Sequence, residues 1–248
     1  MLLRILPLSL ILLVPAVLVA QASPYVPLDD PRLPAFEHLI ALGDVDDPAP
    51  FIRPFRRLDA MGVLDAALAE GRARDTALIA ELRRAFRDDT AEAHWEVRAQ
   101  GGAQAYSHAR RDPLHPGGPD GARPYLDLGL GATFGNIVLV SRPAIETRLV
   151  KDPDWPGRKD LKVTGRQVEG YISAQFKYAR FYYGEMDQNS GPVGLPGIGL
   201  SDYGYPHPRI GFEVGTDRLR LSAQASSLAD QVDTAGQTIH RYFFAHRL

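Results

Sequence analysis

The residues of this chain that could most specifically carry catalytic chemistry are two aspartates, Asp187 and Asp202. Both lie in a Gly/Pro-rich stretch at residues 184–206. A pair of carboxylates flanking a glycosidic bond is the arrangement that most glycoside hydrolases use. Aspartates in such a stretch are also typical of turns, where their side chains bond to the backbone. The pairs Ser190-Gly191 and Ser201-Asp202 lie in the same turn-like sequence, and no Gly-x-Ser-x-Gly element of a serine hydrolase occurs. We therefore predict no catalytic residue.

Metal and cofactor chemistry is not indicated by the sequence. The chain has seven histidines and no cysteine, which excludes disulfides and thiolate metal sites. No two histidines have the spacing of a helical metal site, and His108 and His115 lie in a Gly/Pro-rich stretch at residues 108–124 that is typical of a solvated loop. The spaced glycines at residues 191–197 lack the Lys-Ser/Thr of a phosphate loop. We expect no metal and no cofactor.

Polar side chains around residues 184–206 are the candidates for binding a ligand. They are Lys177, Asp187, Asn189 and Asp202, with Gln175 on the preceding strand pattern. Such side chains on the inside of a barrel can hydrogen-bond sugars or can simply keep the interior wet. The arginine clusters at residues 53–57 and 83–87 allow a similar choice between a solvated helix face and contact with anionic lipid or acidic polysaccharide. Both interpretations stay open at this point.

The elements that would position these residues alternate polar and apolar side chains with a period of two. Strands are predicted at residues 125–134 and 137–148 around a Gly-Asn turn, at 168–183, in a hairpin over 209–225, and from 240, with weaker alternation at 94–104. The longest of them places Ile172, Ala174, Phe176 and Tyr178 on one face and Tyr171, Ser173, Gln175 and Lys177 on the other. Strands of about ten residues with this alternation are typical of outer-membrane β-barrels. A soluble periplasmic β-sandwich has the same period and turns.

In residues 23–89, which precede the strands, the apolar residues have the spacing expected of three short helices. Asp30 and Pro31 predict the start of the first. Apolar residues at helical spacing predict the other two at residues 57–70 and 75–87. Helices this short are marginal alone in water, so we expect them to pack on each other or on one end of a barrel.

Residues 1–22 have the three regions of a secretory signal peptide. One basic residue precedes an apolar run at residues 5–20, and the small-x-small site at 20–22 predicts cleavage before Ser23. An uncleaved transmembrane anchor is the alternative, and Pro15 disfavours it. The formal net charge of -2 gives no basic bias, so no nucleic-acid partner is expected.

Four segments together are similar to one known family. They are the helix start at residues 25–30, the Arg-Pro-Phe segment at 53–57, the stretch at 184–192 with its continuation at 198–202, and the terminal strand at 241–248. On these segments the chain resembles the Wzi-type capsule assembly proteins of the bacterial outer membrane. Ser190 stands where that family usually has Trp, and Glu185 where Arg is common.

The resemblance implies a mainly β protein, a transmembrane antiparallel β-barrel behind a small helical region. It implies a non-catalytic, monomeric protein in outer-membrane lipid that binds or attaches capsular polysaccharide at the cell surface. Members of the family are roughly twice as long, so we expect residues 90–248 to form an incomplete barrel, the N-terminal part of a larger one. An eight-stranded barrel in its own right is the alternative to a fragment. A porin-like channel for small solutes and a soluble periplasmic carbohydrate-active enzyme are the alternatives.

Overall fold

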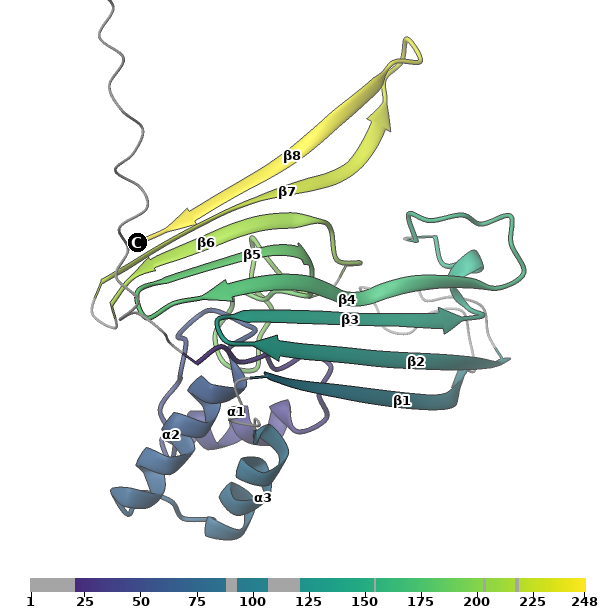
Figure 1. Cartoon of the computed structure of the whole chain (residues 1–248). Coiled ribbons are helices and arrows are strands. Elements are labelled where there is room, and N and C mark those ends of the chain that lie inside the picture. The colour runs from purple at the N-terminus through teal and green to yellow at the C-terminus, as the bar shows by residue number, and fades with distance from the viewer. Residues whose placement is uncertain (1–20, 88–92, 107–120, 154, 203, 217–218) are drawn as a thin grey trace, which may run out of the picture.

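The protein is mainly β, with three helices followed by eight antiparallel strands in one sheet (Figure 1). The computed structural model describes residues 21–87, 93–106, 121–153, 155–202, 204–216 and 219–248. Nearly all of the predicted signal peptide therefore lies outside the described residues, as do His108 and His115.

The helices and strands follow one another in chain order. The helices are α1 (Leu33–Ala41), α2 (Arg57–Ala69) and α3 (Thr76–Phe86), and a short 3-10 turn η1 (Leu149–Lys151) follows β3. The strands are β1 (Ala93–Tyr106), β2 (Gly121–Phe134), β3 (Ile137–Glu146), β4 (Thr164–Gln175), β5 (Ala179–Glu185), β6 (Arg209–Gly215), β7 (Arg220–Val232) and β8 (Thr238–Arg247).

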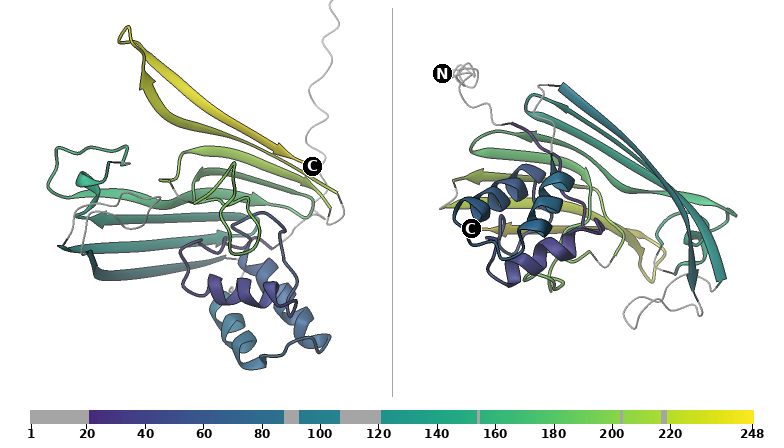
Figure 2. Two further views of the ribbon diagram at one scale, coloured as in Figure 1. Left: turned by 180° about the vertical axis from the view of Figure 1, so that it is seen from behind. Right: turned by 90° about the horizontal axis from the view of Figure 1, so that it is seen from below.

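The sheet is a simple meander in which each strand pairs with the next. Within the described part of the chain, β1 and β8 are the two edges and are not paired with each other, so the sheet is not closed. The sheet is curved, and the N-terminal segment and the helices lie on its concave side (Figure 2). The predicted strand-rich fold is confirmed, whereas closure into a barrel is not seen.

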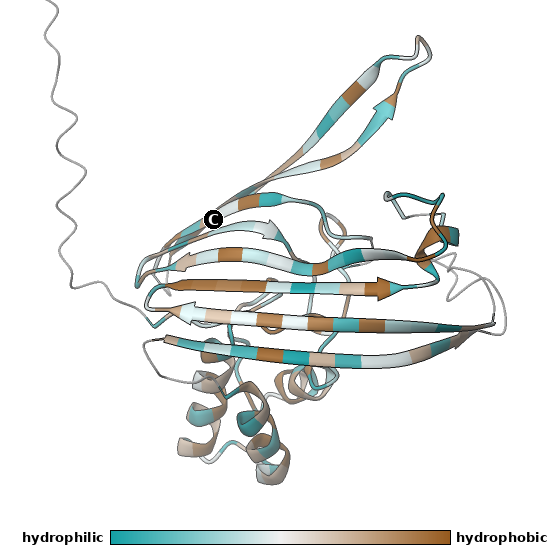
Figure 3. Cartoon of the chain, turned by 45° about the vertical axis from the view of Figure 1, so that its right-hand side comes forward, coloured by the Kyte–Doolittle hydropathy of each residue, from teal (hydrophilic) through white to brown (hydrophobic). Residues whose placement is uncertain are grey.

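The convex face of the sheet carries rows of apolar side chains at matching register. One row crosses all eight strands through Trp95, Ala132, Leu139, Ile172, Tyr183, Ile210, Ala225 and Phe244. A second row crosses β2 to β7 through Phe134, Ile137, Ala174, Phe181, Phe212 and Ala223. Most of these side chains are exposed, and Figure 3 shows the alternation of hydrophobic and hydrophilic residues along the strands. The period-two pattern thus sorts apolar residues onto the outside.

The three helices share a hydrophobic core of their own. Phe36, Leu64, Ile79 and Phe86 are fully buried there with their neighbours. The predicted second and third helices agree with α2 and α3, and Asp75 caps α3 by accepting from Leu78 N (2.9 Å).

The predicted start of the first helix is wrong. Helix α1 begins at Leu33, and Asp30 binds Arg32 in the preceding turn through the Arg32 backbone N–H (2.9 Å) and guanidinium. A tight local pair of opposite charges therefore uses the carboxylate that would otherwise cap the helix.

The single long strand predicted at residues 168–183 is also wrong, because it is two strands joined by a tight turn. Strand β4 ends at Gln175, and Phe176 N donates to Ala179 O (2.7 Å) to close the turn into β5. Residues 176–178 contain no Gly, Pro, Asn or Asp, so nothing in them indicates a turn, and the alternation continues through them. By contrast, the turn at Gly135 and the bend at Pro143, where the register shifts, are confirmed.

Candidate functional site

The N-terminal segment at residues 22–26 crosses the concave face and is fixed to β4. The Gln175 amide accepts from Ser23 N (3.0 Å) and donates to Ser23 O (2.9 Å), and both residues are 0% exposed. Tyr171 Oη accepts from Tyr25 N (3.0 Å), and the two rings lie edge to face. The segment occupies the interior of the curved sheet and has a cavity on each side.

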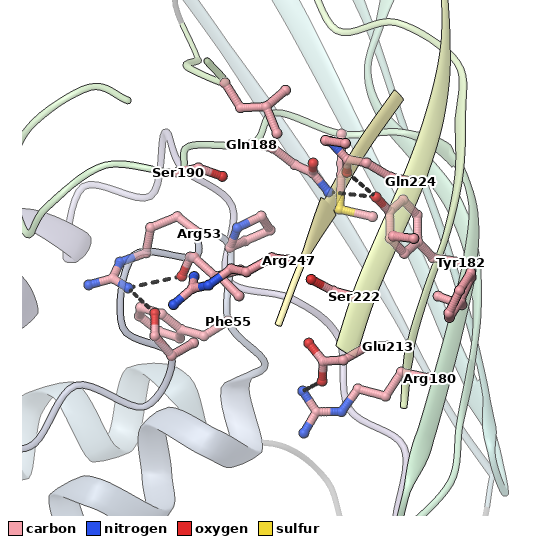
Figure 4. A pocket seen from close by; sticks show the side chains of 18 of the residues that line it. Arg53, Phe55, Arg180, Tyr182, Gln188, Ser190, Glu213, Ser222, Gln224 and Arg247 are labelled. Atoms are coloured by element: carbon pink, nitrogen blue, oxygen red, sulfur yellow. Dashed lines mark hydrogen bonds and ion pairs between the residues drawn. The ribbon is translucent and has the colours of Figure 1, made fainter. Parts of the chain in front are cut away.

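The first cavity, called here the β5–β8 cavity, has a volume of about 380 Å³. Its walls are residues 52–55, part of the β5–β6 connection, and the inner faces of β5 to β8 (Figure 4). Cavities of about 300–1,000 Å³ with a few fixed polar groups are the usual size for small-molecule ligands. The β5–β8 cavity therefore has the size of a small-molecule site.

Charged side chains on the floor of the β5–β8 cavity form a linked set. The Glu213 carboxylate lies 3.2 Å from Arg180 and 3.4 Å from Arg220. Arg180 also lies 3.7 Å from Asp59 of α2. All four side chains are at most about a third exposed, which weakens screening by solvent. The set ties the helices to β5, β6 and β7.

Arg53, on the opposite wall, is a buried structural cation. It is 4% exposed and binds Glu37 (3.0 Å) and Asp47 (3.1 Å), and it donates to the carbonyls of Ala49 and Ile52 (both 2.9 Å). The nearby guanidinium of Arg56 is also buried. The interpretation of residues 53–57 as a solvated helix face is therefore wrong for these two arginines.

Four hydrogen-bonded side chains form a relay, and three of them, Tyr182, Gln188 and Gln224, line the β5–β8 cavity. Arg209 Nη1 donates to Gln188 Oε1 (2.6 Å), Gln188 Nε2 donates to Tyr182 Oη (2.9 Å), and Tyr182 Oη donates to Gln224 Oε1 (2.7 Å). Figure 4 shows Gln188, Tyr182 and Gln224 together on this wall. The relay joins β5, β6 and β7 to the β5–β6 connection.

The second cavity, the β1–β4 cavity, has a volume of about 490 Å³ and polar walls. Arg142 spans it, binding Asp29 of the N-terminal segment (2.7 Å) and Asp127 of β2 (2.6 Å). Beside it, Glu146 accepts from Arg148 (2.8 Å) and Arg166 (2.7 Å). These charges are matched in pairs, so this cavity is held together by its own ion pairs.

The four predicted ligand-binding residues are not brought into one site. Lys177 lies in the exposed β4–β5 turn, with its Nζ 5.0 Å from the ring centre of Tyr178. Asn189 serves the fold, since its backbone pairs with Arg53 (2.8 and 3.1 Å) and its side chain binds Gly197 N (2.8 Å) and Leu195 O (3.1 Å).

Asp187 and Asp202 have different environments. Asp202 is exposed and shares a third cavity of about 280 Å³ with Asn189. Burial raises the pKa of Asp187 to about 7, with the carboxylates of Asp29 and Asp202 adding to the effect and the cation of Arg166 opposing it. At pH 7 the carboxyl group of Asp187 is therefore partly protonated, whereas Asp202 is exposed to solvent.

The residues of the β5–β8 cavity were missed by sequence reasoning. Arg180 and Glu213 stand at inward positions of strands that alternate with apolar residues, so the period-two pattern could have identified them. The relay has no such signal, because Gln188 lies in an irregular connection between β5 and β6.

In comparisons with protein-family models, curated proteins and solved structures, no match to this chain was found. Among the described residues no helix is long and apolar enough to cross a membrane. The same residues contain no group of three or more His, Asp or Glu side chains that could hold a metal ion.

Proposed function

We propose that this protein is an outer-membrane protein that binds surface polysaccharide without catalysis. In this proposal its eight strands are part of the wall of a β-barrel, with the convex face toward lipid and the concave face toward the interior. The observation that carries the proposal is the apolar row that crosses the convex face from Trp95 on β1 to Phe244 on β8. The largest apolar patch of a typical soluble monomer covers only a few hundred Å².

Strand length supports the same proposal. Strands β1 to β4, β7 and β8 have ten or more residues each, and a tilted strand needs about 9–11 residues to cross a bilayer. In lipid each unpaired backbone group costs several kcal/mol. The edges of β1 and β8 must therefore be paired in the membrane, and the proposal includes further strands that close the barrel there.

The contents of the concave face favour binding over passage of solutes. The N-terminal segment is anchored across the interior by Ser23 and Tyr25, and polar side chains line the cavities on both sides of it. A wide aqueous channel needs this space free. A porin-like channel for small solutes is the lesser proposal, and conductance in planar bilayers would favour it.

A carbohydrate-active enzyme is the second candidate, and one observation favours it. Asp187, with its pKa raised by burial to about 7, has an exposed carboxylate, Asp202, close enough to influence it. Glycosidases separate the roles of two carboxylates in this way. Turnover of the host polysaccharide that is lost in Asp187→Asn would support this candidate over the non-catalytic one.

Fractionation and binding test the main proposal together. We expect the protein in washed outer membranes, and its intact mass there also reports whether further chain is attached. We expect the purified protein to retain the surface polysaccharide of its source cell. Recovery only in the soluble periplasm would refute the membrane assignment, and absence of polysaccharide binding would refute the binding role.

A further inference from the structure

We propose that Glu169 and Asp187 form a proton-controlled latch. It holds residues 27–30, the continuation of the N-terminal segment, while the two carboxyl groups are protonated, and it loosens them when both groups ionise. The inference concerns how the interior opens, and it does not depend on polysaccharide as the ligand. Three features carry it: a small enclosed site, two carboxyl groups without partners, and cations that are already engaged elsewhere.

The latch site lies between the chain after Tyr25 and the inner face of the sheet. Residues 27–29 form one side of a cavity of about 10 Å³, and Arg142 of β3, Glu169 of β4 and Asp187 of the β5–β6 connection form the other. A cavity of this volume holds about one water molecule. An organic ligand or a hydrated metal ion does not fit, so a proton is the cation that this site can take up.

Neither carboxyl group of the latch is bound by another side chain. Glu169 is 6% exposed, and among the described residues its carboxyl group and that of Asp187 have no hydrogen bond and no ion pair. A buried carboxylate without such partners is costly. For Asp187, which lies outside the strands, burial is the main cause that raises the pKa to about 7. The hold should therefore be full at acidic pH and be lost as pH rises through about 7.

Charged and titratable groups from every neighbouring element lie near the latch. Near Glu169 are Arg142 of β3, Arg57 of α2, Tyr171 of β4 and Asp29; near Asp187 are Arg166 of β4, Arg209 of β6, Asp29 and Asp202. Three of the arginines bind other carboxylates: Arg57 binds Glu96 (3.1 Å), Arg142 binds Asp29 (2.7 Å) and Asp127 (2.6 Å), and Arg166 binds Glu146 (2.7 Å). Arg209 donates to Gln188 (2.6 Å). Ionised Glu169 and Asp187 would thus have no cation of their own.

Ionisation acts on the N-terminal segment through Arg142. This guanidinium clamps Asp29 with two bonds of 2.7 Å, and it is also the charge that attracts Glu169 most strongly. When Glu169 and Asp187 lose their protons to solvent, they compete with Asp29 for Arg142, and three carboxylates then repel one another around one small cavity. The Asp29 side chain is 50% exposed and can turn toward solvent, so it is the group that yields.

The earlier part of the segment should not respond to pH in this way. Ser23 is held by the amide of Gln175, and Tyr25 N donates to the hydroxyl of Tyr171. Neither an amide nor a phenol ionises near neutral pH. The segment therefore supplies its own internal control, with pH-insensitive anchors at residues 23–25 and the latch at residues 27–30.

The test is hydrogen exchange of the full-length protein in detergent micelles, compared at about pH 5 and about pH 9 after division by the intrinsic rate of an unprotected amide. The reporter is the Asp30 amide, which donates to Pro27 O (3.1 Å). We expect its protection to fall at least about tenfold at the higher pH. Protection at Ser23 and Tyr25 should change less than about twofold.

Three variants assign the effect to the latch. Glu169→Gln combined with Asp187→Asn keeps both side chains neutral, so protection at Asp30 should change less than about twofold between the two pH values. Asp202→Asn removes an exposed carboxylate of the same connection and should keep the wild-type loss. Asp187→Asn alone should shrink the loss at least about threefold, which keeps the test decisive if the double variant fails to fold.

A loss confined to Asp30 and removed by the double variant supports the latch. Equal protection at both pH values in the wild-type protein overturns it, as does a loss that persists in full when Asp187 is replaced by Asn. A loss that Asp202→Asn removes equally well places the titration elsewhere and also overturns it. The same holds for a loss shared by Ser23 and Tyr25, which would report general unfolding.

Discussion

Replacing Gln175 with Ala should release the N-terminal segment from the sheet. The Gln175 side chain satisfies both backbone groups of Ser23, at 3.0 and 2.9 Å, and all of these groups are buried. Leaving a buried donor or acceptor without a partner costs about 1–3 kcal/mol. Two such groups on Ser23 give an expected loss of about 2–6 kcal/mol in the free energy of unfolding, with the lower end applying where water enters the space.

The measurement is denaturant unfolding of the purified protein in detergent micelles, read together with hydrogen exchange of residues 22–26. We expect exchange at Ser23 to accelerate before global unfolding, because its N–H loses the Gln175 acceptor (3.0 Å). Tyr25 N, which donates to Tyr171 Oη (3.0 Å), should stay protected. Gln100→Ala is the matched control. Gln100 is exposed and has a single long bond to Tyr125 Oη (3.4 Å), so its loss should cost less than about 0.5 kcal/mol.

A loss below about 1 kcal/mol for Gln175→Ala, with unchanged exchange at residues 22–26, would refute this reasoning. It would mean that the segment is held by its other contacts, or that it does not lie in the interior at all. Either result would also remove the main argument against an open channel.

Three further perturbations test other parts of the structure. Arg53→Ala should lower the free energy of unfolding by about 3–5 kcal/mol, because it strands the carboxylates of Glu37 and Asp47. Arg72→Ala, at an exposed pair with Asp46, should leave the denaturation midpoint in the same assay nearly unchanged, because solvent screens that pair. Leu139→Arg on the convex face should make the free energy of insertion into lipid vesicles about 2–4 kcal/mol less favourable. Gln100→Arg on the concave face should leave insertion unchanged. Equal insertion of both variants would contradict the assignment of the convex face to lipid. Because the pKa of Asp187 is raised from 3.8 to about 7, the folded state binds the extra proton, so stability should fall by roughly 4 kcal/mol as pH rises from about 4 to about 7 and then level off. Asp187→Asn should flatten that pH profile.

The sequence predicted the strands well because their information is local. Alternation with a period of two placed Ile172 and Ala174 outside and Tyr171, Ser173 and Gln175 inside, as the structure has them. A turn without turn-forming residues, at 176–178, was invisible to the same argument. Local patterns therefore fix which face a residue takes more reliably than where a strand ends.

The candidate site was predicted poorly because its contacts are long-range. Gln175 was assigned to a wet interior, yet it bonds Ser23, 152 positions away in the sequence. Asn189 was assigned to ligand binding, yet its amide closes the loop at Gly197. A polar residue of a given type can either hold the interior together or line a cavity. Only its hydrogen-bond partner in the folded structure distinguishes the two roles.

The way the interior is filled bears on how a polysaccharide would be held. A chain threaded through a barrel would have to pass the N-terminal segment, which is anchored by Ser23 and Tyr25 across the middle of the concave face. A sugar in the β5–β8 cavity would meet Tyr25 of that segment as part of the cavity wall. In the proposed role, a sugar unit held beside the anchored segment would resist sliding of the polymer. That property suits attachment, whereas passage would require the anchors to be released.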